Sequence, residues 1–463
     1  MSLFIFRRDL RIVDNLGFID ACKTSKKFGE PVYPIFILNP EQIDSHKNPY
    51  FSNNSVQFMC ESLEDLNKQL DGKLSLYYGD NAIVLNALFK TEQIKRVFFN
   101  LDHTGYSQKR DKMITDLADK YNIECITHDD VGIFPVDTVK TTTGLLYSKF
   151  TPYYERIRTL RVPVPITAIP KCHFGQIRLT KYLYAISHLN HFYKINPHIL
   201  VHGGRKEAVS ILKRLTTTVK HYNKTHDYPI HPTTHLSAYL KYGCVSAREA
   251  YYAMKKIGAS ASQPLIRQLF WREFYLGISK QHPEIMNGKS LRPSYENIKW
   301  EGTSTNLKKW KEGMTGFPIV DAGMREMNTT GYMHNRLRLI TSAFLIKTLL
   351  RNWRDGEKYF AQTLVDYDFS NNNGGWQWSS GSGTDSQPYF RIFNPWMQSS
   401  NFDPDAEYIK KWIPELADVP AKDIHQWNMT FQNYRSIKYP KPIVDYHDQK
   451  EKALRMYNAA FKY

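Results

Sequence analysis

The sequence has few cysteines and no long apolar run. Its 463 residues include five cysteines that are widely spaced and form no CxxC pair, namely Cys22, Cys60, Cys125, Cys172 and Cys244. This usage argues against a disulfide framework or a zinc site and indicates a reducing compartment. No apolar run approaches the roughly 18 residues that a membrane span needs. The opening MSLFIF is cut short by Arg7 and Arg8, so it does not resemble a signal peptide. We therefore expect a soluble intracellular protein.

Charge and tryptophan are both unevenly distributed along the chain. The length suggests two or three domains, and the net charge is +17. Residues 1–130 carry 16 Lys/Arg against 19 Asp/Glu, residues 131–350 carry 32 against 12, and residues 351–463 carry 14 of each. The middle segment thus holds the whole excess, which is typical of a polyanion-binding surface or of a generically basic one. All nine tryptophans fall between Trp271 and Trp427.

Short, β-rich apolar runs recur in the first 130 residues, at 3–6, 32–38, 74–78, 97–100 and 124–127. The stretches between them are long enough for helices. One stretch, from Met59 to Leu70, has apolar residues at i, i+4, i+7 and i+11, which predicts a helix with Asn54 or Ser55 as N-cap. Strands that alternate with helices predict an α/β domain with a Rossmann-like, doubly wound parallel sheet. No GxGxxG follows the first run, so an ordinary dinucleotide site there is not expected.

The pattern changes after residue 130. The proline-rich run RVPVPITAIP at 161–170 cannot continue a helix and predicts an extended connector. After residue 180 almost every segment has helical periodicity, for example 247–256, 264–279 and 335–350. We therefore predict an α/β domain over 1–130, a linker over 131–180 and a helical domain over 181–463.

The segment 366–378 (DYDFSNNNGGWQW) has an unusual composition. Two acids, four amides (three of them consecutive asparagines), two glycines and two tryptophans in thirteen residues are too polar for a plain core helix. A surface loop with an aromatic anchor is one interpretation. Gly374 and Gly375, however, permit a close backbone approach to a flat ligand, and the amides offer fixed donors and acceptors. Because loops of this kind often carry function, the composition favours a ligand site.

Several motifs together resemble one family. The segment 366–378 is followed by GTDSQPYFRIFNP at 383–395 and is preceded by WREFY at 271–275 and TGYMHNRLR at 330–338. With FRRDLR at 6–11, these motifs agree in order and spacing with the photolyase/cryptochrome family, and the resemblance runs from residue 1 to about 430. It is closest to the class I cyclobutane pyrimidine dimer photolyases. It implies a light-driven DNA repair enzyme in which an electron from excited reduced FAD splits a flipped-out dimer and then returns, with no metal and no protein nucleophile.

The resemblance implies a U-folded FAD in the helical domain. Hydroxyls and backbone N–H groups at a helix start suit its pyrophosphate, and the matching positions are Tyr222, Thr233, Thr234, His235, Leu236 and Ser237. His235 replaces a common Arg, which removes one cationic contact. The positions that match flavin contacts are Arg272, Arg338, Asp366 and Asp368. An Asp–Arg pair beside the ring balances the charge of an anionic reduced flavin, although such pairs also tie helices together.

Asn372 matches the position that faces flavin N5 in this family. A neutral amide accepts from N5–H and has no proton to exchange at pH 7, which favours repair over signalling. Plant-type and insect-type cryptochromes have Asp or Cys there. The resemblance also assigns Trp376, Trp353 and Trp300 to an electron-hopping chain that reduces the flavin and need not take part in repair.

The resemblance places a lesion pocket at Trp271, Trp378, Asn335, Arg336 and Arg391. The two tryptophans would supply apolar faces to a flipped dimer, and the two arginines would contact the kinked backbone. A (6-4) photolyase needs two histidines at positions that here hold Asn335 and Leu339, so (6-4) repair is not expected.

Two residues depart from the family pattern. Gln268 replaces a Glu that bonds both thymine and flavin adenine, and its amide can still bind pyrimidine edges without supplying a charge or a proton. Leu339 replaces a Met that packs on the dimer, a change of shape that costs under about 1.5 kcal/mol.

The second chromophore of this class, methenyltetrahydrofolate or 8-hydroxy-5-deazaflavin, is not specified by the sequence. NLDHT at 100–104 and YSKFTP at 147–152 fall in the expected regions, but a strand end and a linker explain them equally well. We expect UV-damaged DNA as the partner of a monomer that needs neither a membrane nor an obligate protein partner, in the cytoplasm or nucleus. A signalling cryptochrome and a DASH-type enzyme for single strands are the alternatives.

Overall fold

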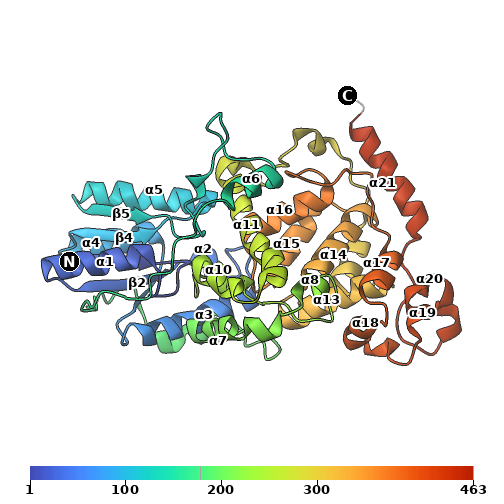
Figure 1. Cartoon of the computed structure of the whole chain (residues 1–463), viewed down its shortest axis with the longest axis horizontal. Coiled ribbons are helices and arrows are strands. Elements are labelled where there is room, and N and C mark those ends of the chain that lie inside the picture. Colours follow the sequence, from blue (N-terminus) through green and yellow to red (C-terminus); the bar gives the residue numbers. More distant parts are fainter. Residues whose placement is uncertain (178, 462–463) are drawn as a thin grey trace.

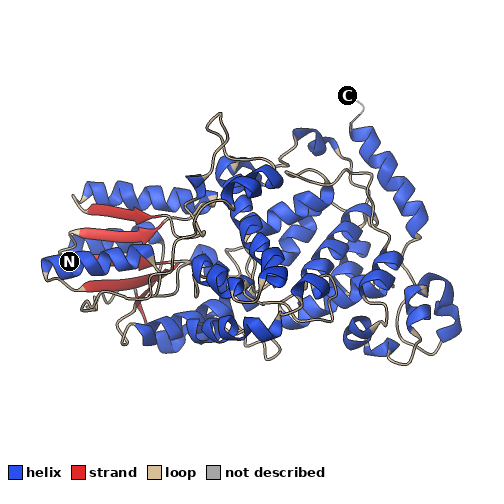
Figure 2. Cartoon of the chain, viewed as in Figure 1, coloured by secondary structure: helices blue, strands red, loops and turns tan. Residues whose placement is uncertain are grey.

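The computed structural model describes residues 1–177 and 179–461. A sheet flanked by helices forms the N-terminal part of the molecule, and a larger, wholly helical part follows it (Figures 1 and 2). The last helix, α21, lies at the far end of the helical part, away from the sheet (Figure 1). The predicted combination of a doubly wound α/β domain and a helical domain is confirmed.

The sheet has six strands in the order β5-β4-β1-β2-β3-β6. The first five pair in parallel, and β6 joins the β3 edge in the antiparallel direction. The strands are β1 Ser2–Phe6, β2 Val32–Leu38, β3 Ser75–Tyr78, β4 Arg96–Asn100, β5 Glu124–His128 and β6 Leu183–Tyr184. All five apolar runs predicted from the sequence are strands.

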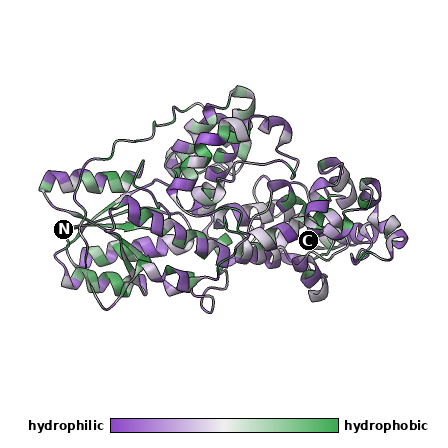
Figure 3. Cartoon of the chain, turned by 90° about the horizontal axis from the view of Figure 1, so that it is seen from below, coloured by the Kyte–Doolittle hydropathy of each residue, from purple (hydrophilic) through white to green (hydrophobic). Residues whose placement is uncertain are grey.

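Helices cover both faces of the sheet, and alternation along the strands decides which residue faces which helix. Phe4 and Phe6 pack in one core with α1 and α3, whereas Leu3 and Ile5 pack in another with α4 and α5. Figure 3 shows apolar residues concentrated along these strands. The helices of this part are α1 Leu16–Phe28, α2 Pro40–Ile43, α3 Asn53–Gln69, α4 Asn81–Thr91 and α5 Gly105–Lys120.

The start of α3 corrects one prediction. The helix exists where its periodicity indicated, but its N-cap is Ser52, whose side chain accepts a hydrogen bond from the Ser55 backbone N at 3.2 Å. Asn54 and Ser55 lie inside the first turn. Asn54 is instead used in tertiary contact, because its Nδ2 donates to the Thr363 carbonyl at 2.7 Å.

The linker is largely irregular and returns across the α/β part. It contains a 3-10 turn, η1 (Val136–Thr138), and one helix, α6 (Phe150–Ile157). The predicted extended connector at 161–170 has no helix or strand. Asp14 and Ile166 exchange two hydrogen bonds, Asp14 N to Ile166 O at 2.9 Å and Ile166 N to Asp14 Oδ1 at 2.8 Å.

The helical part surrounds a core of its own, separate from the two at the sheet, which contains Trp310, Phe344 and Trp353. Pro264 lies inside α11 instead of beginning it, because the helix starts five residues earlier. The helices are α7 Arg205–Thr218, α8 Tyr222–Thr225, α9 Ser237–Lys241, α10 Ala247–Lys255, α11 Ala259–Gln281, α12 Ser304–Glu312, α13 Pro318–Thr330, α14 Asn335–Lys347, α15 Trp353–Thr363, α16 Phe369–Ser380, α17 Pro395–Phe402, α18 Glu407–Trp412, α19 Ala421–His425, α20 Trp427–Thr430 and α21 Tyr446–Ala460.

A buried ion-pair network joins the two parts. Arg248 of α10 bonds Asp14 at 2.9 Å and Asp130 at 2.5 Å, and Asp130 also pairs with Arg11. These side chains are all at most 4% exposed. Paired charges at such depth hold a fixed geometry, because separating them would leave a charge without a partner.

Candidate flavin and lesion site

A cavity with a volume of about 530 Å³ lies in the helical part. Its walls come from α8, the start of α9, α11, α14 and α16, which are far apart in the sequence. A cavity of this size with a mixed polar and apolar lining is typical of a cofactor site.

The predicted ligand segment 366–378 is a helix for most of its length. α16 begins after Asp368, whose side chain accepts from the Asn371 N at 3.2 Å, and it ends at Gly381 in the left-handed region with φ 90°. Its polarity is partly satisfied within the protein, because Gln377 donates to Asn373 at 2.8 Å. The expectation of a loop is therefore wrong, whereas the expected ligand cavity lies along one face of this helix.

The two glycines of α16 have different surroundings. A Cβ at Gly374 would lie 2.3 Å from the Tyr275 ring, so this glycine permits close packing of α11 on α16. A Cβ at Gly375 would meet no atom within 4 Å, and Gly375 lines the cavity. Only Gly375 thus offers the open backbone surface that a flat ligand needs.

Asn372 is held in one orientation at the cavity wall. Its Nδ2 donates to the Glu357 carbonyl at 3.2 Å and to Glu357 Oε1 at 3.0 Å, which identifies the NH₂ side of the amide. No described residue donates to its Oδ1, which is left as an acceptor. Burial raises the pKa of Glu357 to about 7, although hydrogen bonds from Asn372 and Tyr367 act in the opposite direction.

Two carboxylates and two guanidiniums lie at the cavity. Arg338 Nη2 donates to both oxygens of Asp366, at 3.0 and 2.9 Å. Asp368 is buried, and Arg272 donates to the Val131 and Leu240 carbonyls at 2.9 and 3.2 Å. Within the described chain, Arg272 has no carboxylate at hydrogen-bond distance. Because Arg272 bonds only to carbonyl oxygens here, its charge is available to an anionic ligand.

Two tryptophans are part of the cavity lining. Trp271 of α11 stacks on Phe150 of α6, with ring centroids 3.6 Å apart and an interplanar angle of 7°. One face of the indole is therefore covered by the linker, and Trp378 of α16 is half-buried. Gln268 is exposed, and its Nε2 approaches the Pro264 carbonyl at 3.5 Å.

Most of the residues predicted for the site come together in this cavity. Those that line it are Tyr222, Thr233, Thr234, Leu236, Ser237, Gln268, Trp271, Arg272, Asn335, Arg338, Leu339, Asp366, Asp368, Asn372, Trp376 and Trp378. The predicted site residues that do not line this cavity are His235, Arg336, Arg391, Trp353 and Trp300. Arg336 bonds Asp227 at 2.5 Å, and Arg391 is exposed.

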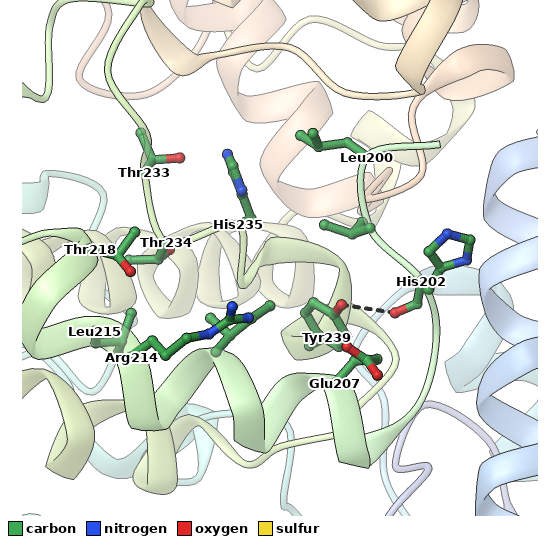
Figure 4. A pocket seen from close by; sticks show the side chains of 12 residues that line it. Leu200, His202, Glu207, Arg214, Leu215, Thr218, Thr233, Thr234, His235 and Tyr239 are labelled. Atoms are coloured by element: carbon green, nitrogen blue, oxygen red, sulfur yellow. Dashed lines mark hydrogen bonds between the residues drawn. The ribbon is translucent and has the colours of Figure 1, made fainter. Parts of the chain in front are cut away.

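His235 faces a smaller cavity, of about 290 Å³, on the other side of Thr233 and Thr234 (Figure 4). His235 has φ 51°, in the left-handed region, which turns its side chain away from the larger cavity. Burial lowers the pKa of His235. Tyr239 closes part of the small cavity by donating to the His202 carbonyl at 2.8 Å. His235 is therefore no substitute for a cationic phosphate contact.

The three tryptophans of the predicted chain pack in or against one hydrophobic core and differ in burial. Trp376 lines the cavity and is 2% exposed, Trp353 is equally buried at the start of α15, and Trp300 is partly buried. The Trp376 ring rests on Gly356 of α15, where a Cβ would lie 2.1 Å from it.

Sequence reasoning missed several residues of the cavity. Among them are Lys241, Tyr275, Tyr332 and Asn371. Burial lowers the pKa of Lys241 to about 7, and its Nζ donates to Ser55 Oγ at 2.6 Å. Glu357, which orients Asn372, precedes Asn372 by fifteen residues and lies on the helix before it. No spacing of residues in the sequence indicates such a contact between two helices.

The two segments suggested for a second chromophore make contacts inside the protein. Asn100 donates to Asp9 Oδ2 at 2.6 Å and to Asn15 Oδ1 at 2.7 Å. The segment 147–152 contains Phe150, which stacks on Trp271. Over the described residues, no helix is long and apolar enough to cross a membrane. The same residues contain no group of three or more His, Cys, Asp or Glu arranged to hold a metal ion.

The chemical groups that line the cavity match the parts of an FAD molecule. The open face at Gly375, the free acceptor of Asn372, the Arg272 guanidinium and the hydroxyls of Thr233 and Thr234 match a flat, partly anionic ring system linked to a diphosphate. The residues present therefore fit this cofactor.

The fold and this site define a flavin-binding protein of two parts, and the comparisons agree. Residues 2–171 match the family description "DNA photolyase", and residues 265–459 match "FAD binding domain of DNA photolyase". The chain is 34% identical to the deoxyribodipyrimidine photo-lyase of Halobacterium salinarum, over 99% of both chains. It is 32% identical to that of Escherichia coli, over 99% of this chain and 98% of the other.

A solved structure gives the same result. The photolyase of Sulfolobus tokodaii, crystallised with two FAD molecules, superposes with a TM-score of 0.87 at 35% identity, over 99% of both chains. The chain therefore belongs to the DNA photolyase/cryptochrome family.

Proposed function

We propose that this protein is a deoxyribodipyrimidine photo-lyase that repairs cyclobutane pyrimidine dimers in DNA with light. The observation that carries the proposal is the arrangement around Asn372. An acceptor oxygen fixed by Glu357 lies on the same helix as Trp378, and both residues line the cavity, so that a flavin and a flipped-out pyrimidine dimer would meet there.

FAD is the cofactor that the family match supports, and we propose that it acts in its reduced form, FADH⁻. When bound, it supplies the light-excited electron that splits the dimer and takes that electron back. Asn372 would accept from flavin N5–H without exchanging a proton. Arg272, Arg338, Asp366 and Asp368 would fix the charge around the ring, so the role of the chain is positioning and electrostatics.

The lesion would enter between the aromatic side chains of the rim. Trp378 and the free side of Trp271 offer apolar faces to the saturated rings, each worth on the order of 1–3 kcal/mol by analogy with base stacking. Gln268, Asn335 and Leu339 would contact the pyrimidine edges. Arg336 and Arg391 lie outside the cavity, where they would contact phosphates of a kinked duplex.

The tryptophans Trp376, Trp353 and Trp300 would reduce the flavin. Trp376 lines the cavity, and all three side chains pack in or against the hydrophobic core of the helical part. Indole side chains that share one core suit stepwise electron transfer. We propose that this chain prepares the cofactor and is not needed for repair by protein that is already reduced.

We also propose that a second, light-harvesting chromophore binds in the α/β part or the linker. Methenyltetrahydrofolate and 8-hydroxy-5-deazaflavin are both candidates, at or near 100–104 and 147–152. The Sulfolobus tokodaii photolyase adds FAD itself, since its second FAD implies a novel light-harvesting cofactor. We further propose that the protein acts as a monomer on UV-damaged DNA, in the cytoplasm or nucleus, without an obligate protein partner.

Repair is tested with chemically reduced protein and a UV-irradiated, thymine-containing duplex under blue or near-UV light. We expect thymine absorbance near 260 nm (an assay choice) to recover in the light and not in a dark control. Trp376→Phe should repair at the wild-type rate once reduced chemically, yet fail to photoreduce its own flavin. Protein that holds reduced FAD and binds the duplex without any recovery of absorbance would overturn the proposal.

A further inference from the structure

Arg8 connects the α/β part to the cavity of the helical part. It lies two residues after the end of β1, and its Nη2 forms an ion pair with the carboxylate of Asp368. Its Nη1 lies 3.3 Å from Asp102 Oδ2, and its Nε donates to the Lys241 carbonyl at 3.0 Å. One guanidinium thus bonds the loop after β4, the end of α9 and the residue that begins α16.

Asp368 has two uses that depend on its position. Its carboxylate lines the cavity, and it caps α16, the helix that carries Asn372, Trp376 and Trp378. An N-cap of this kind stabilises the first turn of its helix. Whatever holds Asp368 in place therefore also holds the start of the helix along which the flavin would lie.

Charge gives Arg8 a second effect. Burial alone would raise the pKa of Asp368, but Arg8 and then Arg272 lower it, so the group stays ionised. Arg8 thus balances the charge of the Asp368 carboxylate, as Arg338 balances that of Asp366. Without Arg8, an anion in the cavity would face a carboxylate that has lost its partner, and the repulsion between them would disfavour the anion.

We propose that Arg8 is a positioning residue of the flavin site, which acts through Asp368 and makes the α/β part an electrostatic component of a cofactor bound in the helical part. The inference rests on the proposed function for the placement of FAD in this cavity. It assigns a role to the FRRDLR motif at 6–11 that is separate from any antenna.

The test measures the reduction of bound FAD by spectroelectrochemical titration of the holoenzyme. Arg8→Gln should shift the equilibrium toward oxidised flavin by at least tenfold, which for a two-electron couple is about 30 mV. The matched control is Arg96→Gln. Arg96 is another ion-paired arginine of the α/β part, bonded to Glu30 and Glu124 at the opposite end of the sheet, and its substitution should leave the equilibrium within twofold of wild type.

A double-mutant cycle separates this role from a structural one. In an Asp368→Asn background, Arg8→Gln should no longer shift the potential, because the carboxylate it acts through is absent. If Arg8→Gln does not fold, Arg8→Lys carries the test. A single ammonium cannot hold Asp102 and Asp368 together, so we expect a smaller shift in the same direction, again lost in Asp368→Asn.

Two results would overturn the inference. One is a potential that Arg8→Gln leaves within twofold of wild type, and the other is a shift that persists in the Asp368→Asn background. Neither needs light or DNA, so they are independent of repair. Wild-type protein that binds no FAD would overturn the proposed function as well, whereas bound FAD that does not respond to Arg8 overturns only this inference.

Discussion

The two parts of the chain use their charged residues differently. In the α/β part, arginines are paired with carboxylates of the same part, as in Arg7 with Asp111 and Arg11 with Asp130. At the cavity of the helical part, Arg272 has only carbonyl partners among the described residues, and all nine tryptophans lie in this part. The α/β part therefore pairs its own arginines, whereas the cavity of the helical part leaves charge and aromatic surface for a ligand.

This contrast places the ligand site in the helical part. The two parts still depend on each other, as the contacts of Arg8 and Arg248 show. Arg248 reaches from α10 into the acidic turn of the α/β part, and Arg8 reaches in the opposite direction to Asp368. Variants that uncouple the parts or alter only one of them can test this division.

The largest effect is expected at the buried junction. Arg248→Ala removes the partner of Asp14 and leaves buried carboxylates undercompensated, so the free energy of unfolding should fall by about 3–5 kcal/mol. Denaturant unfolding measures this change. Lys358→Ala, at an exposed position of α15, is the control and should change stability by less than about 0.5 kcal/mol. Equal effects of the two would show that the junction is not a fixed contact.

A smaller loss is expected at the lesion side of the cavity. Trp378→Ala should weaken binding of dimer-containing duplex by about 1–3 kcal/mol, because one apolar face for the flipped bases is removed. Binding of undamaged duplex should stay unchanged, since phosphate contacts supply it. Fluorescence anisotropy with both duplexes checks this. A parallel loss for both would place Trp378 outside lesion recognition.

The third effect is a change in pH dependence. Burial raises the pKa of Glu357 from its ordinary value of 4.5 to about 7, so between these values the folded chain holds a proton that the unfolded chain has lost. Stability from this group is therefore present below pH 4.5 and is lost as the pH rises through 7, by about 1.4 kcal/mol per pH unit. Glu357→Gln should remove this slope from the unfolding free energy measured between pH 5 and 7. An unchanged slope would mean that Glu357 is ionised in the folded protein.

The smallest effect is expected where the chain departs from its relatives. Leu339→Met restores the side chain that the family pattern places at the dimer and should change the affinity for damaged duplex by under about 1.5 kcal/mol. The unfolding free energy should hardly change, because volume is conserved. A larger gain would show that this chain recognises a lesion of different shape.

Predictability from sequence also differs between the parts. Five apolar runs gave all five parallel strands, because residues buried on both faces of a parallel sheet leave a continuous signal. The N-cap of α3 was misplaced, since Ser52, Asn54 and Ser55 are all suitable caps and Asn54 is used by a distant carbonyl. Local sequence cannot distinguish these uses.

At the cavity, residue types carried more information than secondary structure. A surface loop was one interpretation of segment 366–378 because its composition is too polar for a plain core helix, yet Asn373 and Gln377 bond each other within a helix. The contacts Asn372–Glu357 and Arg8–Asp368 join residues 15 and 360 positions apart. No periodicity reports such pairs, so they could be found only in three dimensions.

The FAD content of Gly375→Leu tests most directly whether the cofactor lies in this cavity. The new side chain would point into the cavity without meeting any atom within 4 Å of its Cβ, so the protein should fold with unchanged stability and lose bound FAD by at least about 100-fold. Gly374→Ala, one residue earlier, would instead strike Tyr275 and destabilise the fold. We predict a folded Gly375→Leu protein without flavin absorbance and without repair. Full retention of FAD in that variant would contradict the placement of the cofactor in this cavity.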